Sequence, residues 1–135
     1  MIDPKAHVRV ARPSRDLALA ERFYVDGLGL AVLYRASAAA EGEHDLLMLG
    51  WREATWHFEL TRDPRRPIEP VPTPDDLFVL YLNGPVDPGI VRRLEAAGGK
   101  RVPAHNPYWD RFGVTIEDPD GYRLVLCERA WSNEG

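Results

Sequence analysis

The sequence predicts an α+β protein made of two similar modules, each a strand, a helix and then three strands. Strand-length segments that alternate in polarity, or are continuously apolar, lie on both sides of the chain's middle. In each half, one helix-length segment with apolar residues at helical spacing follows the first strand. Residues 63–75 divide the halves, because their five prolines can neither continue a helix nor donate hydrogen bonds to a sheet.

Composition places the chain among ordinary globular proteins. It has 135 residues, a net charge of −4 and 44% hydrophobic residues, enough for one domain with its own core. The charges are interspersed, so no basic face favours nucleic acid, and no apolar run is long enough to cross a membrane. The only cysteine, Cys127, cannot form an internal disulfide. We therefore expect a cytoplasmic protein that binds neither nucleic acid nor membrane.

The first module, residues 5–62, opens with a strand at 7–12 that puts Val8 and Val10 on one face. A helix follows Pro13 and ends at the glycines that begin at Gly27. Its apolar residues recur at helical spacing: Leu17, Leu19, Ala20, Phe23 and Tyr24. Three further segments read as strands: 30–34, 46–49 and 55–61.

The second module, residues 76–131, repeats this order. A strand at 77–82 precedes a helix at 88–97, which the glycine pair 98–99 ends. Strands are then predicted at 100–103, 112–117 and 122–128. Asp118-Pro119-Asp120-Gly121 is a turn signal, since proline is favoured at the second position of a turn and glycine at the fourth. Each helix would cover one face of its sheet, and the other two faces would combine into a cup.

Several short motifs follow one another in the order and spacing of a known family. They are Asp16-Leu17 with Phe23-Tyr24 and the glycine motif 27–30, then Phe58-Glu59-Leu60-Thr61, then Asp118 to Tyr122. Together they resemble the vicinal oxygen chelate family, which includes glyoxalase I, extradiol dioxygenases and bleomycin resistance proteins. The phrase at 106–109 resembles an uncharacterised bacterial subgroup. The resemblance covers nearly the whole chain and implies the glyoxalase/bleomycin-resistance/dioxygenase fold, a cup-shaped sheet of two βαβββ modules, and a homodimer.

Metal-dependent members of that family place four ligands in the cup. The resemblance puts Glu59 at the ligand position of the first module, and His7 or, by a stricter count, Lys5 on its first strand. The matching positions of the second module are Leu77 and Val125, whose aliphatic side chains cannot ligate an ion. We therefore expect no dedicated metal and no cofactor.

Strand alternation and loop position predict the residues that would bind a ligand in the cup. These are His7, Arg9, His57, Glu59, Tyr81, Trp109 and Arg123. Trp109 stands in a proline-flanked loop and is expected to be a pocket lid or a dimer contact. An unpaired carboxylate is costly in a cup, so Glu59 should find Arg9, Arg123, His7 or His57 as its partner. Such a pair is either structural or an anchor for an anionic ligand.

The sequence thus favours a homodimeric small-molecule-binding protein without a dedicated metal, in the manner of the family's drug-binding members. The alternative is a metal-dependent lyase, isomerase or dioxygenase that uses His7 and Glu59. A third interpretation is a module whose dimer surface serves another protein.

Overall fold

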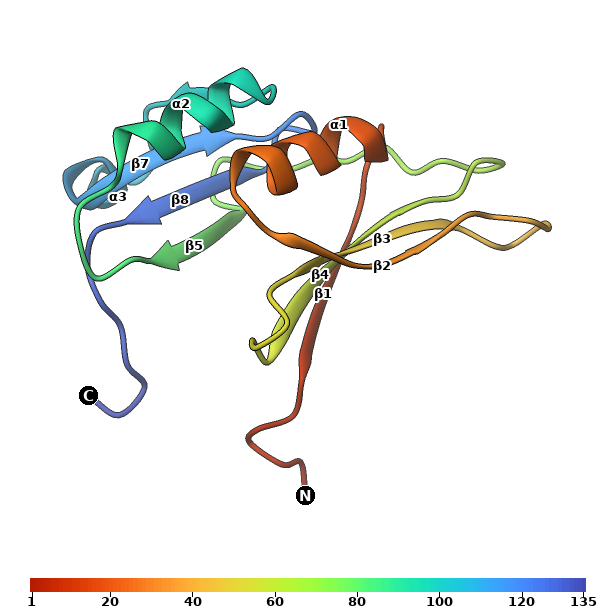
Figure 1. Ribbon diagram of the computed structural model, residues 1–135, viewed down its shortest axis with the longest axis horizontal. Coiled ribbons are helices and arrows are strands. Elements are labelled where there is room, and N and C mark those ends of the chain that lie inside the picture. Colours follow the sequence, from red (N-terminus) through yellow and green to blue (C-terminus); the bar gives the residue numbers. More distant parts are fainter.

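The computed structural model describes residues 1–135 and contains two four-stranded sheets beneath a layer of helices (Figure 1). The first module contains β1 (Val8–Pro13), α1 (Leu17–Glu21), η1 (Arg22–Gly27), β2 (Ala31–Ala36), β3 (Asp45–Gly50) and β4 (Trp56–Arg62). The second contains β5 (Leu77–Tyr81), α2 (Pro88–Ala96), β6 (Lys100–Val102), α3 (Pro107–Phe112), β7 (Gly113–Glu117) and β8 (Arg123–Cys127). The predicted α+β fold of two βαβββ modules is confirmed. No helix is both long and apolar enough to cross a membrane.

The two sheets have the same topology. Their strand orders are β1-β4-β3-β2 and β5-β8-β7-β6, and in each sheet the first strand of the module lies parallel to the last. Glu59 of β4 pairs with Ala11 of β1, and Val125 of β8 pairs with Val79 of β5. The predicted correspondence of Glu59 and Val125 on last strands is therefore correct.

The first helix begins as the α-helix α1 and continues directly as the π-helix η1. The Asp16 carboxylate accepts hydrogen bonds from the backbone N–H groups of Ala18 and Leu19 and so caps α1. Further on, the Leu28 N–H donates to the Phe23 carbonyl, five residues back, which makes η1 a π-helical segment. Of the apolar residues at helical spacing, Leu19 is 43% exposed, whereas Ala20, Phe23 and Tyr24 are buried. Leu19 lies about 100° around the helix from buried Ala20, at the margin of the inward face.

A single hydrophobic core joins the helices to one face of each sheet. The ring centroids of Phe58 and Phe78 lie 4.3 Å apart, which links the two sheets directly. The helices meet at Gly27, where a Cβ would lie 2.9 Å from a methyl carbon of Leu94. Each sheet turns its buried leucines, among them Leu60 of β4 and Leu124 of β8, toward this core, so strand alternation puts His57 and Val125 on the opposite faces.

The outer face of the second sheet is covered by α3, which the sequence prediction treated as a loop. Asn106 caps this helix by accepting from the Tyr108 N–H, and Pro107 occupies its first turn, where a missing N–H costs nothing. Six residues are too few to show a helical period. Trp109 of α3 lies 6.4 Å from Tyr81, ring centroid to ring centroid. On the same face of the sheet Val125 and Cys127 are fully buried.

The turn at 118–121 also connects the two modules. The Tyr24 hydroxyl donates to Asp118 at 2.6 Å, and the Ser14 hydroxyl donates to Asp120 at 2.6 Å. Burial raises the pKa of Asp118, although hydrogen bonds from Tyr24 and two backbone N–H groups oppose the shift. The sequence motif predicted a backbone turn, and its carboxylates also hold the start of the first helix.

Candidate functional site

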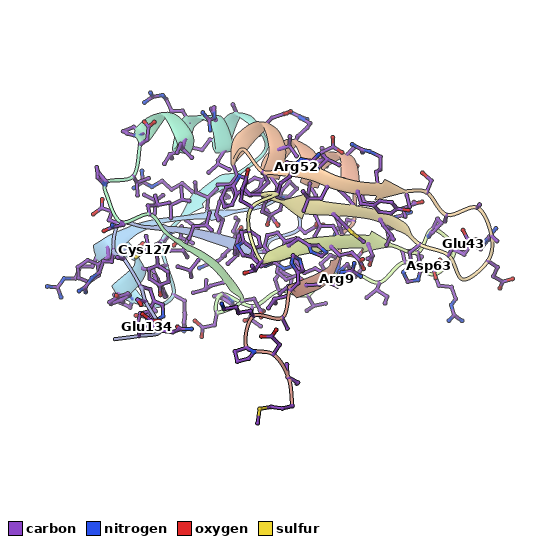
Figure 2. All side chains as sticks on the ribbon, turned by 60° about the horizontal axis from the view of Figure 1, so that its bottom comes forward. Arg9, Glu43, Arg52, Asp63, Cys127 and Glu134 are labelled. Atoms are coloured by element: carbon purple, nitrogen blue, oxygen red, sulfur yellow. The ribbon has the colours of Figure 1, made fainter.

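A polar cluster occupies the outer face of the first sheet. Arg9 of β1 lies opposite His57 of β4, and Glu59 lies opposite Met48 of β3, so strand alternation places these side chains on one face. His7, immediately before β1, joins them. Figure 2 shows Arg9 on the first sheet, well apart from Cys127 on the second.

Arg9 is the centre of this cluster. One terminal nitrogen lies 3.1 Å from the Glu59 carboxylate, and its Nε donates to His57 Nε2 at 3.1 Å. The other terminal nitrogen lies 3.7 Å from the sulfur of Met48. The predicted cationic partner for Glu59 is therefore present, and it is Arg9. The Glu59 side chain is 13% exposed and that of Arg9 is 49% exposed, so one partner is largely buried and the other faces solvent.

The hydrogen bonds fix the protonation of both imidazoles. Arg9 Nε–H can only donate, so His57 Nε2 must carry a lone pair. The proton of a neutral His57 then sits on Nδ1 and is donated to His7 Nε2 at 2.7 Å. His7 is therefore also neutral in this arrangement, with its own proton on Nδ1. A chain of donors runs from Arg9 through His57 to His7.

Electrostatics agree with this assignment. Burial, the Arg9 charge and the neighbouring His7 lower the pKa of His57, while Glu59 opposes them. His57 thus remains a neutral acceptor for Arg9 near neutral pH.

The cluster retains unused donors. Of the five guanidinium N–H groups of Arg9, three point at His57, Glu59 and Met48, which leaves two. His7 Nδ1–H has no protein acceptor. These groups lie on an exposed edge strand, where they can bind an acceptor oxygen of a ligand.

A pocket of about 390 Å³ opens at the far end of the same face, within the usual size range for small-molecule sites. Its lining residues are Pro13, His44, Thr61, Arg62, Asp63, Arg66 and Ile68. Thr61 is two residues beyond Glu59 on β4, so the pocket and the Arg9 cluster share one sheet face. Neither Arg62 nor Arg66 forms an ion pair.

The other candidate residues form a second group, on the second sheet. Tyr81 lies against Trp109, while Arg123 pairs with Glu117 at 3.4 Å and donates to the Pro103 carbonyl. Within one chain, this group does not meet the Arg9 cluster. Sequence reasoning missed Met48, because its position depends on the β3–β4 register, and Trp131, which follows the last strand.

The donor set does not fit the metal that the family resemblance implies. Glu59 is engaged by Arg9 and His7 by His57, so an ion there would sit beside a guanidinium cation. No three His, Cys, Asp or Glu side chains are grouped closely enough to hold a metal. The second-module positions are Leu77 and Val125, as the sequence indicates. The residues at these positions therefore do not fit a resident metal ion.

Comparison with known proteins identifies the relatives of this chain. Residues 8–61 match the YycE-like N-terminal domain and residues 75–128 match the YycE-like C-terminal domain. The uncharacterised protein YycE of Bacillus subtilis is 40% identical over 122 residues, which is 90% of this chain and 86% of that protein.

Solved structures of related proteins have the same fold as this chain. A crystal structure of a YycE protein of unknown function from Bacillus subtilis has a TM-score of 0.86 at 36% identity, over 97% of this chain and 95% of that one. TnmS3, an antibiotic-binding protein from Streptomyces sp. CB03234, has a TM-score of 0.60 at 22% identity, over 93% and 97% of the two chains, and shares the fold alone. The chain belongs to the YycE-like family, and through its fold and motifs to the vicinal oxygen chelate proteins.

Proposed function

We propose that this protein binds a small molecule on the outer face of the first sheet, with an acceptor group of the ligand held by Arg9 and His7. The observation that carries the proposal is the half-exposed Arg9 guanidinium, oriented by Glu59 and His57 and left with unused donors. A guanidinium with a fixed plane binds carboxylate or phosphate through two parallel hydrogen bonds. The antibiotic-binding function of TnmS3, which shares the fold, supports a small organic ligand.

The proposal is tested by NMR titration of the ¹⁵N-labelled protein with a set of small carboxylates and phosphates. The Arg9 Nε–H and His57 ring signals should shift together and saturate at one concentration. Arg9→Gln should abolish the saturable shift of His57, whereas Arg35→Gln, at a solvent-exposed ion pair with Glu21, should leave it unchanged. If no compound gives a saturable shift at His57, the proposal is wrong.

We also propose that two copies complete the cup as a homodimer. The single chain exposes 8594 Å² of surface, whereas a compact monomer of this mass exposes about 7,100 Å². The apolar residues Val8 and Val10 of the edge strand β1 are 54% and 47% exposed. Because Tyr81, Trp109 and Arg123 contact residues of their own module and not the Arg9 cluster, a second copy would supply the face that carries them. Light scattering that gives only monomer at micromolar concentration would contradict this arrangement.

Two further expectations accompany the proposal. Substituting Glu59 by Gln should weaken ligand binding without changing the metal content of the purified protein, because Glu59 orients Arg9 rather than an ion. Stoichiometric metal in protein purified without chelator, lost in Glu59→Gln, would instead favour a metal-dependent enzyme.

The single buried cysteine, Cys127, supports a cytoplasmic location.

A further inference from the structure

A second pocket lies in the other module, beside the end of β5 and the segment that follows β8. Its volume is about 440 Å³, and three of its lining residues are aromatic: Tyr81, Tyr108 and Trp131. It lies outside the Arg9 cluster, on a different sheet. Ligand binding in this pocket can be measured apart from binding at the Arg9 cluster, although Tyr81 also lies on the face that the proposed homodimer would bring to that cluster.

The rings of Tyr81 and Trp131 have an unusual relation to each other. Their planes are inclined by only 31° and their centroids lie 6.3 Å apart. The aromatic pairs of the core instead meet edge to face, as Phe58 and Phe78 do at 72° and 4.3 Å. A flat ring inserted between two parallel rings requires about 7 Å, about 3.5 Å on each side. The Tyr81 and Trp131 rings are tilted and their centroids lie closer than that, so Trp131 would have to turn before a third ring could stack against both.

The mobility that the insertion requires is available on one side. Trp131 is 70% exposed, and its indole N–H donates only to Asn133, two residues along the same segment. Tyr81, in contrast, ends a strand that pairs with β8 and lies against Trp109. Tyr81 is thus the more constrained of the two rings and Trp131 the more exposed, which suits a site in which Trp131 adjusts to the ligand.

The pocket also has a preferred charge. Arg129 is the only charged side chain that lines it, and Arg129 forms no ion pair. Its guanidinium lies 4.7 Å from the centre of the Phe112 ring, which holds it at the pocket wall. A ligand between Tyr81 and Trp131 would therefore meet a cation beside the rings.

From this geometry we propose that Tyr81 and Trp131 form an aromatic clamp for a planar aromatic ligand that carries an anionic or acceptor substituent directed at Arg129. The ligand stacks between the two rings, and Trp131 moves to admit it. Stacking tolerates many ring systems, so the clamp recognises flatness and charge rather than one particular compound.

The test uses three probes and calorimetry. Naphthalene-2-sulfonate should bind, cyclohexanesulfonate, with the same charge but no flat ring, should bind at least about 10-fold more weakly, and naphthalene-2-methylammonium should also bind more weakly. Trp131→Leu should weaken naphthalene-2-sulfonate about 10-fold, and Arg129→Gln should remove the preference for the anionic probe. Tyr34→Leu, at a 54% exposed tyrosine of the first sheet, is the matched control and should bind normally.

The Trp131 indole N–H signal, identified by its loss in Trp131→Leu, reports the clamp separately from the Arg9 cluster. It should shift on addition of naphthalene-2-sulfonate. Equal affinity for the flat and the saturated sulfonate, or wild-type affinity in Trp131→Leu, would overturn the proposal. So would a Trp131→Leu variant that alters the oligomeric mass by light scattering while probe binding persists, because Trp131 would then belong to an interface between copies.

Discussion

Arg9 Nε lies 3.1 Å from His57 Nε2, and this one contact determines the proton positions of two histidines. Because arginine cannot accept a hydrogen bond, His57 must present a lone pair to it, and His7 must in turn accept from His57. The arrangement exists only while both rings are neutral. Protonating either histidine removes a lone pair that one of the two bonds requires.

The first prediction concerns this proton order. In the wild-type protein both His7 and His57 should carry their proton on Nδ1, which ¹⁵N long-range correlation spectra of the rings detect directly. Arg9→Gln should release His57 from this tautomer, and the pKa of His57 should rise because a neighbouring positive charge is removed. Arg35→Gln, on β2, is the control and should change neither property. A predominant Nε2–H tautomer of His57 in the wild type would contradict the assignment.

The second prediction concerns the pH dependence of stability. The pKa of His57 is lowered from its ordinary value of 6.5, so just below that pH the unfolded chain binds more protons than the folded one. The contribution of His57 to the free energy of unfolding is complete above pH 6.5. It is lost as the pH falls through the pKa that His57 has in the folded chain. His57→Gln should flatten this part of the profile in urea unfolding measured at several pH values.

A third prediction has the opposite sign. The pKa of Asp118 is raised from 3.8, so above that pH the folded chain binds more protons than the unfolded one. The contribution of Asp118 to the free energy of unfolding is complete below pH 3.8. It is lost as the pH rises through the pKa that Asp118 has in the folded chain. Asp118→Asn should remove this downward slope and leave the His57 slope in place. An unchanged profile in the same urea series would show that Asp118 does not titrate abnormally.

The fourth prediction tests the contact between the modules. Tyr24→Phe removes the hydroxyl that donates to Asp118 and leaves a buried acceptor short of one partner. The expected loss is about 1–3 kcal/mol of unfolding free energy, because an unsatisfied buried group costs its full desolvation. Tyr34→Phe is the matched control, since Tyr34 is 54% exposed and should change stability by less than about 0.5 kcal/mol. Equal stability of the two variants would show that the Tyr24 hydroxyl contributes nothing.

The fifth prediction tests the junction of α3 with β7. A Cβ on Gly113 would overlap the carbonyl oxygen of Leu126 on the neighbouring strand, and backbone cannot move aside cheaply. Gly113→Ala should therefore cost about 3 kcal/mol in urea unfolding. Gly84→Ala, where a Cβ would meet no atom within 4 Å, is the control. A Gly113→Ala variant as stable as the control would mean that α3 does not join β7 as described.

The sequence predicted the fold well because its signals are local. Alternation in segments such as 55–61, the glycines after each helix and the prolines at 63–75 each act over a few residues. Helix α3 was missed because one and a half turns leave no period to detect. Spacing alone also does not locate the centre of a buried face, so it could not show that Leu19 is exposed while its neighbour Ala20 is buried.

The site was predictable only in part. Alternation placed His57 and Glu59 on one face, and the cost of a buried charge predicted a cation beside Glu59. The choice of Arg9 over Arg123 depends on which strands are neighbours, and that is a property of the folded chain. The direction in which the outer faces point also depends on how the two modules pack. No local sequence pattern predicts how the two modules pack.

The bonds from Ser14 to Asp120 and from Tyr24 to Asp118 join residues 106 and 94 positions apart. During synthesis, Ser14 and Tyr24 therefore lack their buried polar partners until most of the polypeptide has been made. A first module made alone would present Ser14 and Tyr24 without them. Contacts that close such long loops form late and slowly. The two halves resemble each other in architecture, but they are expected to fold as one cooperative unit rather than one after the other.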